Sequence, residues 1–262
     1  RLLSINFNQK QVVMAKFDGI FEIKGTLQGM SFYKSKDGML IRKKGGVDKS
    51  RIKNDPAFQR TRENGSEFGH NAKMGQLMRK SVANLLSLAK DYRVSSRMSQ
   101  AMSQVKNLDF DSARGERKVW IGMESAEGKQ ALRGFDFNLN SPFNSVFRSQ
   151  YVLDTVTGTV TIANFNPATN LSLPQGATHA SFSVSVASVD FELENYGTTY
   201  SPKENFALVD GSLDLTLTPS GMPGGTGSTF FYFLIEFFQE LNGAQYPLKN
   251  NSHNVLYLME VV

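Results

Sequence analysis

The side chains best suited to binding chemistry are the basic residues between Lys34 and Lys53. Two aromatic residues, Phe32 and Tyr33, come just before this block, and Gly45-Gly46 gives it a flexible point. Because Lys and Arg neutralise phosphate groups and aromatic rings stack on bases, the pattern predicts a polyanion-binding segment. The candidate residues are Lys34, Lys36, Arg42, Lys43, Lys44, Lys49, Arg51 and Lys53, followed by Arg60 and Arg62. Basic hairpins also protect exposed strand edges from aggregation, and this alternative needs no nucleic acid.

The sequence predicts no catalytic or metal-binding constellation. Cysteine is absent, which excludes disulfides, thiolate ligands and cysteine nucleophiles. The formal match of Ser31 and Lys34 to a Ser-x-x-Lys motif falls in a predicted strand, where residues three apart point to opposite faces. The glycine-rich segment from 221 to 227 lacks the Lys-Ser/Thr ending of a phosphate-binding loop. No second ligand lies at metal-binding spacing from His70, His179 or His253. We therefore expect a non-enzymatic protein with no metal and no cofactor.

The charged residues divide the chain into two opposite parts. Residues 1–133 carry 26 basic and 13 acidic side chains, a net charge of +13, whereas residues 134–262 carry 3 and 11, a net charge of −8. Such a division suggests a polyanion as partner, or attraction between copies of the chain. We expect residues 1–18 to be an N-terminal extension or arm, residues 19–133 a basic mixed α/β region, and residues 134–262 an acidic β-sandwich domain.

The elements that must position the basic residues are a β-ribbon and two helices. Apolar and polar residues alternate from Gly19 to Gly46, and Asp37-Gly38 predicts a hairpin turn between strands. Asp55 before Pro56 predicts a helix start, and Asn64-Gly65 predicts its end. Apolar residues at helical spacing then predict helices over 66–90 and 95–107. Residues 108–147 are expected to form short strands joined by turns.

From residue 151 onward the hydrophobic pattern has a period of two, which indicates strands. Breakers such as Gly158, Gly197, Pro202 and Gly211 separate these runs at the spacing of a β-sandwich. Abundant Thr, Val, Ser and Phe favour antiparallel strands with one dry face. The predicted fold class is therefore α+β, with an N-terminal β-ribbon plus helices and a C-terminal antiparallel β-sandwich. Its strands are expected within 152–165, 178–193, 206–217, 229–239 and 255–262.

Several short motifs occur near the two ends of the chain. They are Lys24-Gly25-Thr26, Phe32-Tyr33-Lys34, Lys36-Asp37-Gly38, Asn54-Asp55-Pro56-Ala57-Phe58, Arg60-Thr61-Arg62-Glu63-Asn64, Phe237-Phe238-Gln239, Asn242-Gly243 and Tyr246-Pro247-Leu248. With these motifs the sequence resembles a family of uncharacterised Bacteroidota proteins, and the resemblance covers most of the chain after Met14. The family implies no activity, cofactor or catalytic residue, and is consistent with a cellular or prophage-encoded product.

Three functional hypotheses follow from the sequence. The first is a structural protein that assembles with copies of itself into a shell, filament or virion-like particle. The second is a nucleic-acid-binding or other polyanion-binding protein that uses the basic half. The third is a surface or carbohydrate-binding β-sandwich.

Residues 1–13 lack the apolar core of a Sec signal, which favours a cytoplasmic or virion location over export. One interpretation makes these residues an extension upstream of a start at Met14. No apolar run has the length of a membrane span.

Overall fold

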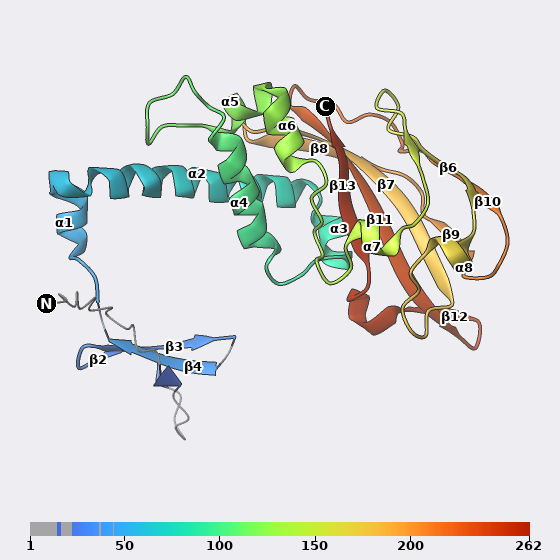
Figure 1. The fold of residues 1–262 in the computed structure, drawn as a ribbon, viewed down its shortest axis with the longest axis horizontal. Coiled ribbons are helices and arrows are strands. Elements are labelled where there is room, and N and C mark those ends of the chain that lie inside the picture. The colour runs from blue at the N-terminus through green and yellow to red at the C-terminus, as the bar shows by residue number, and fades with distance from the viewer. Residues whose placement is uncertain (1–14, 17–22, 37, 44) are drawn as a thin grey trace, which may run out of the picture. The chain divides into compact units, whose positions relative to one another are not determined.

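The computed structural model describes residues 15–16, 23–36, 38–43 and 45–262, and its chain divides into two compact units (Figure 1). Unit 1 is Arg1–Gln59 and unit 2 is Arg60–Val262. The fold contains helices and antiparallel sheets, which confirms the predicted α+β class. The sequence placed the boundary between residues 133 and 134, but the compact units divide 74 residues earlier, between Gln59 and Arg60.

Unit 1 is built from a four-stranded antiparallel sheet with strand order β1-β4-β3-β2. The hairpin predicted at Asp37-Gly38 is present between β3 and β4, although Asp37 itself is outside the described residues. Gln28 and Gly29 join β2 to β3 with φ of 46° and 77°, the left-handed backbone of a tight hairpin turn. The elements are β1 (Ala15–Lys16), β2 (Gly25–Leu27), β3 (Met30–Ser35), β4 (Gly38–Lys43), α1 (Lys49–Asn54) and η1 (Pro56–Phe58).

The first long helix, α2 (Gln59–Ser81), is continuous. The helix start at Asp55-Pro56 is confirmed, because the Asp55 carboxylate accepts a hydrogen bond from Ala57 N at 2.9 Å. The predicted helix end at Asn64-Gly65 is wrong. One glycine inside a helix costs about 1 kcal/mol relative to alanine. This cost is too small to end a helix that continues on either side of the glycine. The remaining helices are α3 (Ala83–Leu88), α4 (Val94–Lys106), α5 (Val119–Glu124), α6 (Ala126–Leu132), α7 (Phe143–Val146), α8 (Pro167–Asn170) and the 3-10 helix η2 (Leu248–Asn251).

The strands predicted between residues 108 and 147 are wrong, since the regular elements of this segment are the helices α5, α6 and α7, with only isolated β-bridges at Asp136 and Phe147. Helices of four to seven residues are too short to display a 3.6-residue period. They form because glycines permit close packing: a Cβ added at Gly122 would lie 2.0 Å from Val105 O, and one at Gly128 would lie 1.9 Å from Gly122 O. Tertiary contact with α4 therefore decides the structure here.

The C-terminal strands form two antiparallel sheets, as predicted. In the larger sheet β11 pairs with β7, with β12 and β13 on the far side of β11 and β8 and β9 on the far side of β7. The smaller sheet has the order β10-β6-β5. The strands are β5 (Val152–Leu153), β6 (Val160–Phe165), β7 (His179–Asp190), β8 (Asn195–Tyr200), β9 (Glu204–Ala207), β10 (Leu213–Leu217), β11 (Ser228–Leu241), β12 (Ala244–Pro247) and β13 (Val255–Val261).

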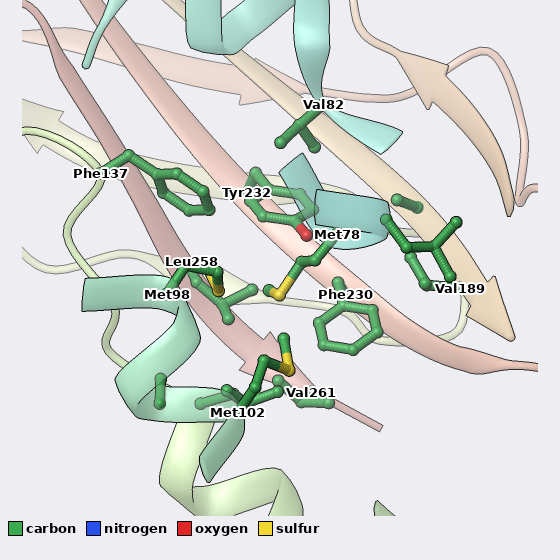
Figure 2. Packing of buried hydrophobic residues seen from close by; sticks show 14 of the residues in the cluster. Met78, Val82, Met98, Met102, Phe137, Val189, Phe230, Tyr232, Leu258 and Val261 are labelled. Atoms are coloured by element: carbon green, nitrogen blue, oxygen red, sulfur yellow. The ribbon is translucent and has the colours of Figure 1, made fainter. Parts of the chain in front are cut away.

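The larger sheet is dry on both faces at its centre, so the expectation of one dry face is wrong. Alternate residues of β11 point to opposite sides, and Phe230 and Tyr232 pack against helices while Phe231 and Phe233 pack against the smaller sheet. Helices α2 to α6 supply the cover that strand periodicity alone cannot reveal. Figure 2 shows three methionines from two of these helices beside residues of the sheet, and all belong to the same core cluster: Met78, Met98 and Met102.

Two outer strands of the larger sheet, β13 and β8, are bonded to nearby chain. Along β13, Gly134 N and Phe137 N donate to Leu258 O and Leu256 O, both at 2.9 Å. At the end of β8, Ser220 N donates to Tyr200 O at 3.1 Å, and the side-chain Oγ1 of Thr199 donates to the carbonyl of Gly221 at 2.6 Å, within the glycine-rich loop that the sequence placed between strands. The backbone bonds along β13 use groups that an exposed edge would offer to another chain.

Phe233 tests the core between the two sheets. Its ring lies 5.2 Å from the ring of Phe182 and 5.6 Å from that of Phe143, between centroids. Phe233→Ala is expected to lower the free energy of unfolding by about 3–5 kcal/mol, since it leaves a cavity in a packed aromatic cluster. Chemical denaturation measures the loss. Val156→Ala, at a side chain that is exposed, should change stability by less than about 0.5 kcal/mol, and equal effects of the two substitutions would contradict this packing.

Candidate functional site

The sheet of unit 1 carries basic and apolar side chains on the same face. Residues directly opposite one another in an antiparallel pair share a face. The register therefore groups Met30 with Lys43, Phe32 with Ile41, and Lys34 with Met39. Leu27 of β2 lies opposite Met30 and extends this face. The face formed by Leu27, Met30, Phe32, Lys34, Met39, Ile41 and Lys43 is called the mixed face below.

The mixed face keeps large apolar side chains in contact with solvent. Leu27 is 57% exposed and Met30 is 49% exposed. None of the described residues between 23 and 59 is buried, and none belongs to either hydrophobic core cluster. A small sheet without a buried layer has little to stabilise it by itself. The mixed face consequently has the character of a contact surface.

The opposite face of the same sheet holds Arg42. Its guanidinium carbon lies 5.4 Å from the centroid of the Tyr33 ring, a cation–π arrangement. Because Arg42 and Lys43 point to opposite faces, the sheet does not gather the predicted basic residues into one stripe. The Tyr33 ring already contacts the Arg42 guanidinium, so one role of this ring is to orient that cation, in addition to the stacking on a base that the sequence predicts.

Helix α1 separates its basic residues into two kinds. Lys49 and Lys53 are four residues apart and share one side of the helix, and both are exposed. Neither forms an ion pair with any described residue. Arg51 instead pairs with Asp55 at 3.0 Å, and its guanidinium carbon lies 5.6 Å from the Phe58 ring centroid. Lys49 and Lys53 are therefore the basic pair most available to an anionic partner.

The other predicted polyanion-binding residues do not join this pair. Lys36 follows β3 at the hairpin turn, and Lys44 is outside the described residues. Arg60 and Arg62 are on α2, in unit 2. The predicted polyanion-binding residues thus come from a sheet, a turn and two helices. The structure brings only some of them close together.

A cavity of about 310 Å³ lies at one end of the larger sheet in unit 2. Its wall includes Trp120, Glu124 and Lys129 from α5 and α6, Asp190 at the end of β7, and Glu192 from the turn that follows. The sequence reasoning missed these residues, because it interpreted residues 108–147 as strands and so could not place Trp120 beside Asp190. The only available signal was that the chain has a single tryptophan.

The buried charges of unit 2 hold loops in place. Glu67 accepts hydrogen bonds from Arg117 Nε and Nη2 at 2.8 Å and from Gly115 N at 2.8 Å, and Lys106 Nζ lies 2.5 Å from its carboxylate. The Arg117 guanidinium, aided by Lys106 and Gly115, lowers the pKa of Glu67 to about 2 against the opposing effect of burial. These four bonds tie α2 to α4 and to the loop that contains Gly115 and Arg117.

Asp91 likewise holds a loop in place, the one between α3 and α4. Burial alone would raise the pKa of Asp91, but hydrogen bonds from Leu139 N and Arg93 N and the Arg97 guanidinium lower it overall. Arg97 also donates to the carbonyls of Asp136 and Phe137. In the described ranges, no group of three or more His, Cys, Asp or Glu side chains is close enough to hold a metal ion.

Comparison with known proteins does not extend this picture. Searches against protein-family models, curated proteins and solved structures find no match for the chain. The resemblance to a Bacteroidota family therefore stays a prediction. Across the described helices, none combines the length and apolar character needed to cross a bilayer.

The Glu67 cluster gives a prediction for the pH dependence of stability. A carboxyl whose folded pKa is depressed contributes stability above its unfolded pKa, near 4.5, and loses that contribution as the pH falls towards its folded pKa, about 2. Glu67→Gln should therefore lower the free energy of unfolding at pH 7 by about 3 kcal/mol. The difference from wild type should shrink between pH 5 and 2, as followed by denaturant titration. Glu116→Gln, at an exposed position, is the control, and a Glu67→Gln difference independent of pH would contradict the prediction.

Proposed function

We propose that this protein is a non-enzymatic structural subunit that assembles with copies of itself. Unit 1 carries the proposal, because it forms a sheet with an apolar and basic face yet buries none of its described residues. Burial of apolar surface against another chain would supply the stabilisation that such a sheet lacks. The mixed face is the contact surface in this proposal.

The distribution of charge supports a second copy as the partner. Residues 1–59 contain 12 basic and 5 acidic side chains, a net charge of +7, whereas residues 134–262 have a net charge of −8. A basic unit on one copy and an acidic surface on another attract each other without any further component. Contacts between a unit of one chain and a different surface of the next are heterologous, and they produce rings or filaments.

Light scattering after size exclusion tests the assembly. At low salt and increasing concentration we expect species larger than the 29.1 kDa monomer, and at high salt we expect their mass to fall because exposed charges are screened. A strict monomer at every salt and protein concentration would overturn the proposed function.

Adjacent residues on β3 provide a matched pair of variants. Met30→Asp puts a charge on the mixed face and should raise the concentration at the assembly midpoint by about tenfold or more, the equivalent of about 1.4 kcal/mol. Ser31→Asp makes the same charge change on the opposite face of the same strand. Light scattering should find this control close to wild type, and equal effects of the two variants would show that the mixed face is not the contact.

A second candidate function is binding of a nucleic acid or another polyanion. Lys49 and Lys53 favour it, because both are exposed and neither forms an ion pair with a residue that the structure describes. The carbohydrate-binding hypothesis has less support, because the exposed aromatic side chains come from separate elements and loops, namely Phe68, Tyr92, Phe110, Tyr196 and Tyr246. Phosphate contacts make affinity fall as salt rises, by a slope of about 0.7 per contact for single strands.

The polyanion candidate predicts a change in that slope. Lys49→Glu with Lys53→Glu should weaken binding of a single-stranded oligonucleotide and reduce the slope of log affinity against log salt by about 1.4, as measured by fluorescence anisotropy. Lys80→Glu with Lys90→Glu makes the same charge change at exposed positions of unit 2 and should act less. Absence of binding at low salt would exclude this candidate.

A further inference from the structure

The cavity at the end of the larger sheet has a fixed acidic wall. Asp190 accepts hydrogen bonds from Leu193 N at 2.8 Å, Glu192 N at 2.9 Å and Thr226 Oγ1 at 2.7 Å. These three donors hold the turn after β7 in one shape, and Glu192 of this turn lines the cavity. Glu124 of α5 lines the same cavity, and both glutamates are exposed. Neither is paired with a basic side chain in the described part of the chain.

An indole forms another part of the wall. Trp120 is half-buried, packs beside the helix-side core and lines the cavity together with Glu124. Indole has the strongest cation–π attraction among aromatic side chains, and the attraction grows when the cation is partly removed from water. Three carboxylates and one indole, with Lys129 the single basic residue of the lining, make a site for an organic cation.

The size of the cavity limits the cation. About 310 Å³ accommodates one long side chain but not a folded element. A lysine side chain fits this chemistry, since its alkyl stem can lie along the indole while its ammonium meets the carboxylates. Lys49 and Lys53 are exposed, lie on one side of α1 and have no ion-pair partner among the described residues.

We propose that this cavity receives Lys49 or Lys53 from the basic unit of a second copy of the chain. The inference rests on the proposed function, because it assigns to self-assembly a specific receiving site in unit 2. Charge complementarity selects the occupant. The donor unit has a net charge of +7, whereas unit 2, which carries the cavity, has 17 basic and 19 acidic side chains, a net charge of −2. Within the described lining three carboxylates face one lysine, so an incoming ammonium group is attracted to the cavity itself. The mixed face supplies apolar contact area, and the lysine in the cavity fixes the register between copies.

The single tryptophan makes this site observable in the intact protein. As the protein concentration rises at low salt, Trp120 emission should change with the same midpoint as assembly measured by light scattering, because the arriving cation alters the indole environment. Glu124→Lys with Glu192→Lys should abolish the emission change and raise the assembly midpoint by about tenfold or more. The control, Glu116→Lys with Glu204→Lys, makes the same charge change at exposed positions outside the cavity lining and should retain the emission change.

A charge exchange identifies the donor. The Lys49→Glu/Lys53→Glu chain and the Glu124→Lys/Glu192→Lys chain should each assemble poorly alone, and a mixture of the two should assemble and restore the Trp120 response. No rescue in the mixture would overturn the inference. The inference is also wrong if Trp120 emission changes between low and high salt to the same extent at every protein concentration, because a lysine from the same chain would then fill the cavity.

The failures of the two proposals are distinguishable. If wild type assembles, Met30→Asp weakens assembly and Trp120 emission stays constant, the cavity inference is wrong and the proposed function stands. If wild type is a monomer under every condition, both are wrong. Saturable quenching of monomeric protein by lysine amide, lost in Glu124→Lys/Glu192→Lys, would then identify a small-molecule site and likewise overturn a second copy as occupant.

Discussion

The antiparallel pairing of β7 with β11 is the interaction on which the rest of unit 2 depends. It runs from Ser228 opposite Val189 to Phe238 opposite His179 and forms the middle of the larger sheet. Because successive side chains alternate, this single ladder divides its residues between two cores, one shared with helices and one shared with the smaller sheet. Neither core is complete without it. The acidic turn after β7 and the indole of α5 meet at the end of this ladder, so the same pairing also positions the cavity.

Much of this architecture could be predicted from the sequence. The period-two runs located β6, β7, β10, β11 and β13, and Asp37-Gly38 and Asp55-Pro56 marked a real hairpin and a real helix start. These signals are local: they depend on alternation or on one residue's preferred backbone. The strand β8 was missed, because the run Asn195–Tyr200 is polar and lies at an edge where burial imposes no apolar pattern.

The remaining features depend on contacts between distant residues. Helices α5 and α6 exist because Gly122 and Gly128 let three helical segments approach closely, which a window of sequence cannot indicate. The domain boundary was placed by charge, yet residues on both sides of 133 share the helix-side core, since burial and net charge are independent properties. The polyanion candidates were chosen by residue type, whereas strand register decides that Arg42 and Lys43 face opposite ways. No local pattern in the sequence indicates the cavity around Trp120.

The backbone pairing along β13 restricts how unit 2 can meet another molecule. With β13 bonded to residues 134–137, strand addition is blocked along this strand. Another protein that binds at this edge must therefore be recognised by side chains. Single substitutions can tune such recognition, whereas backbone hydrogen bonds are the same in every protein.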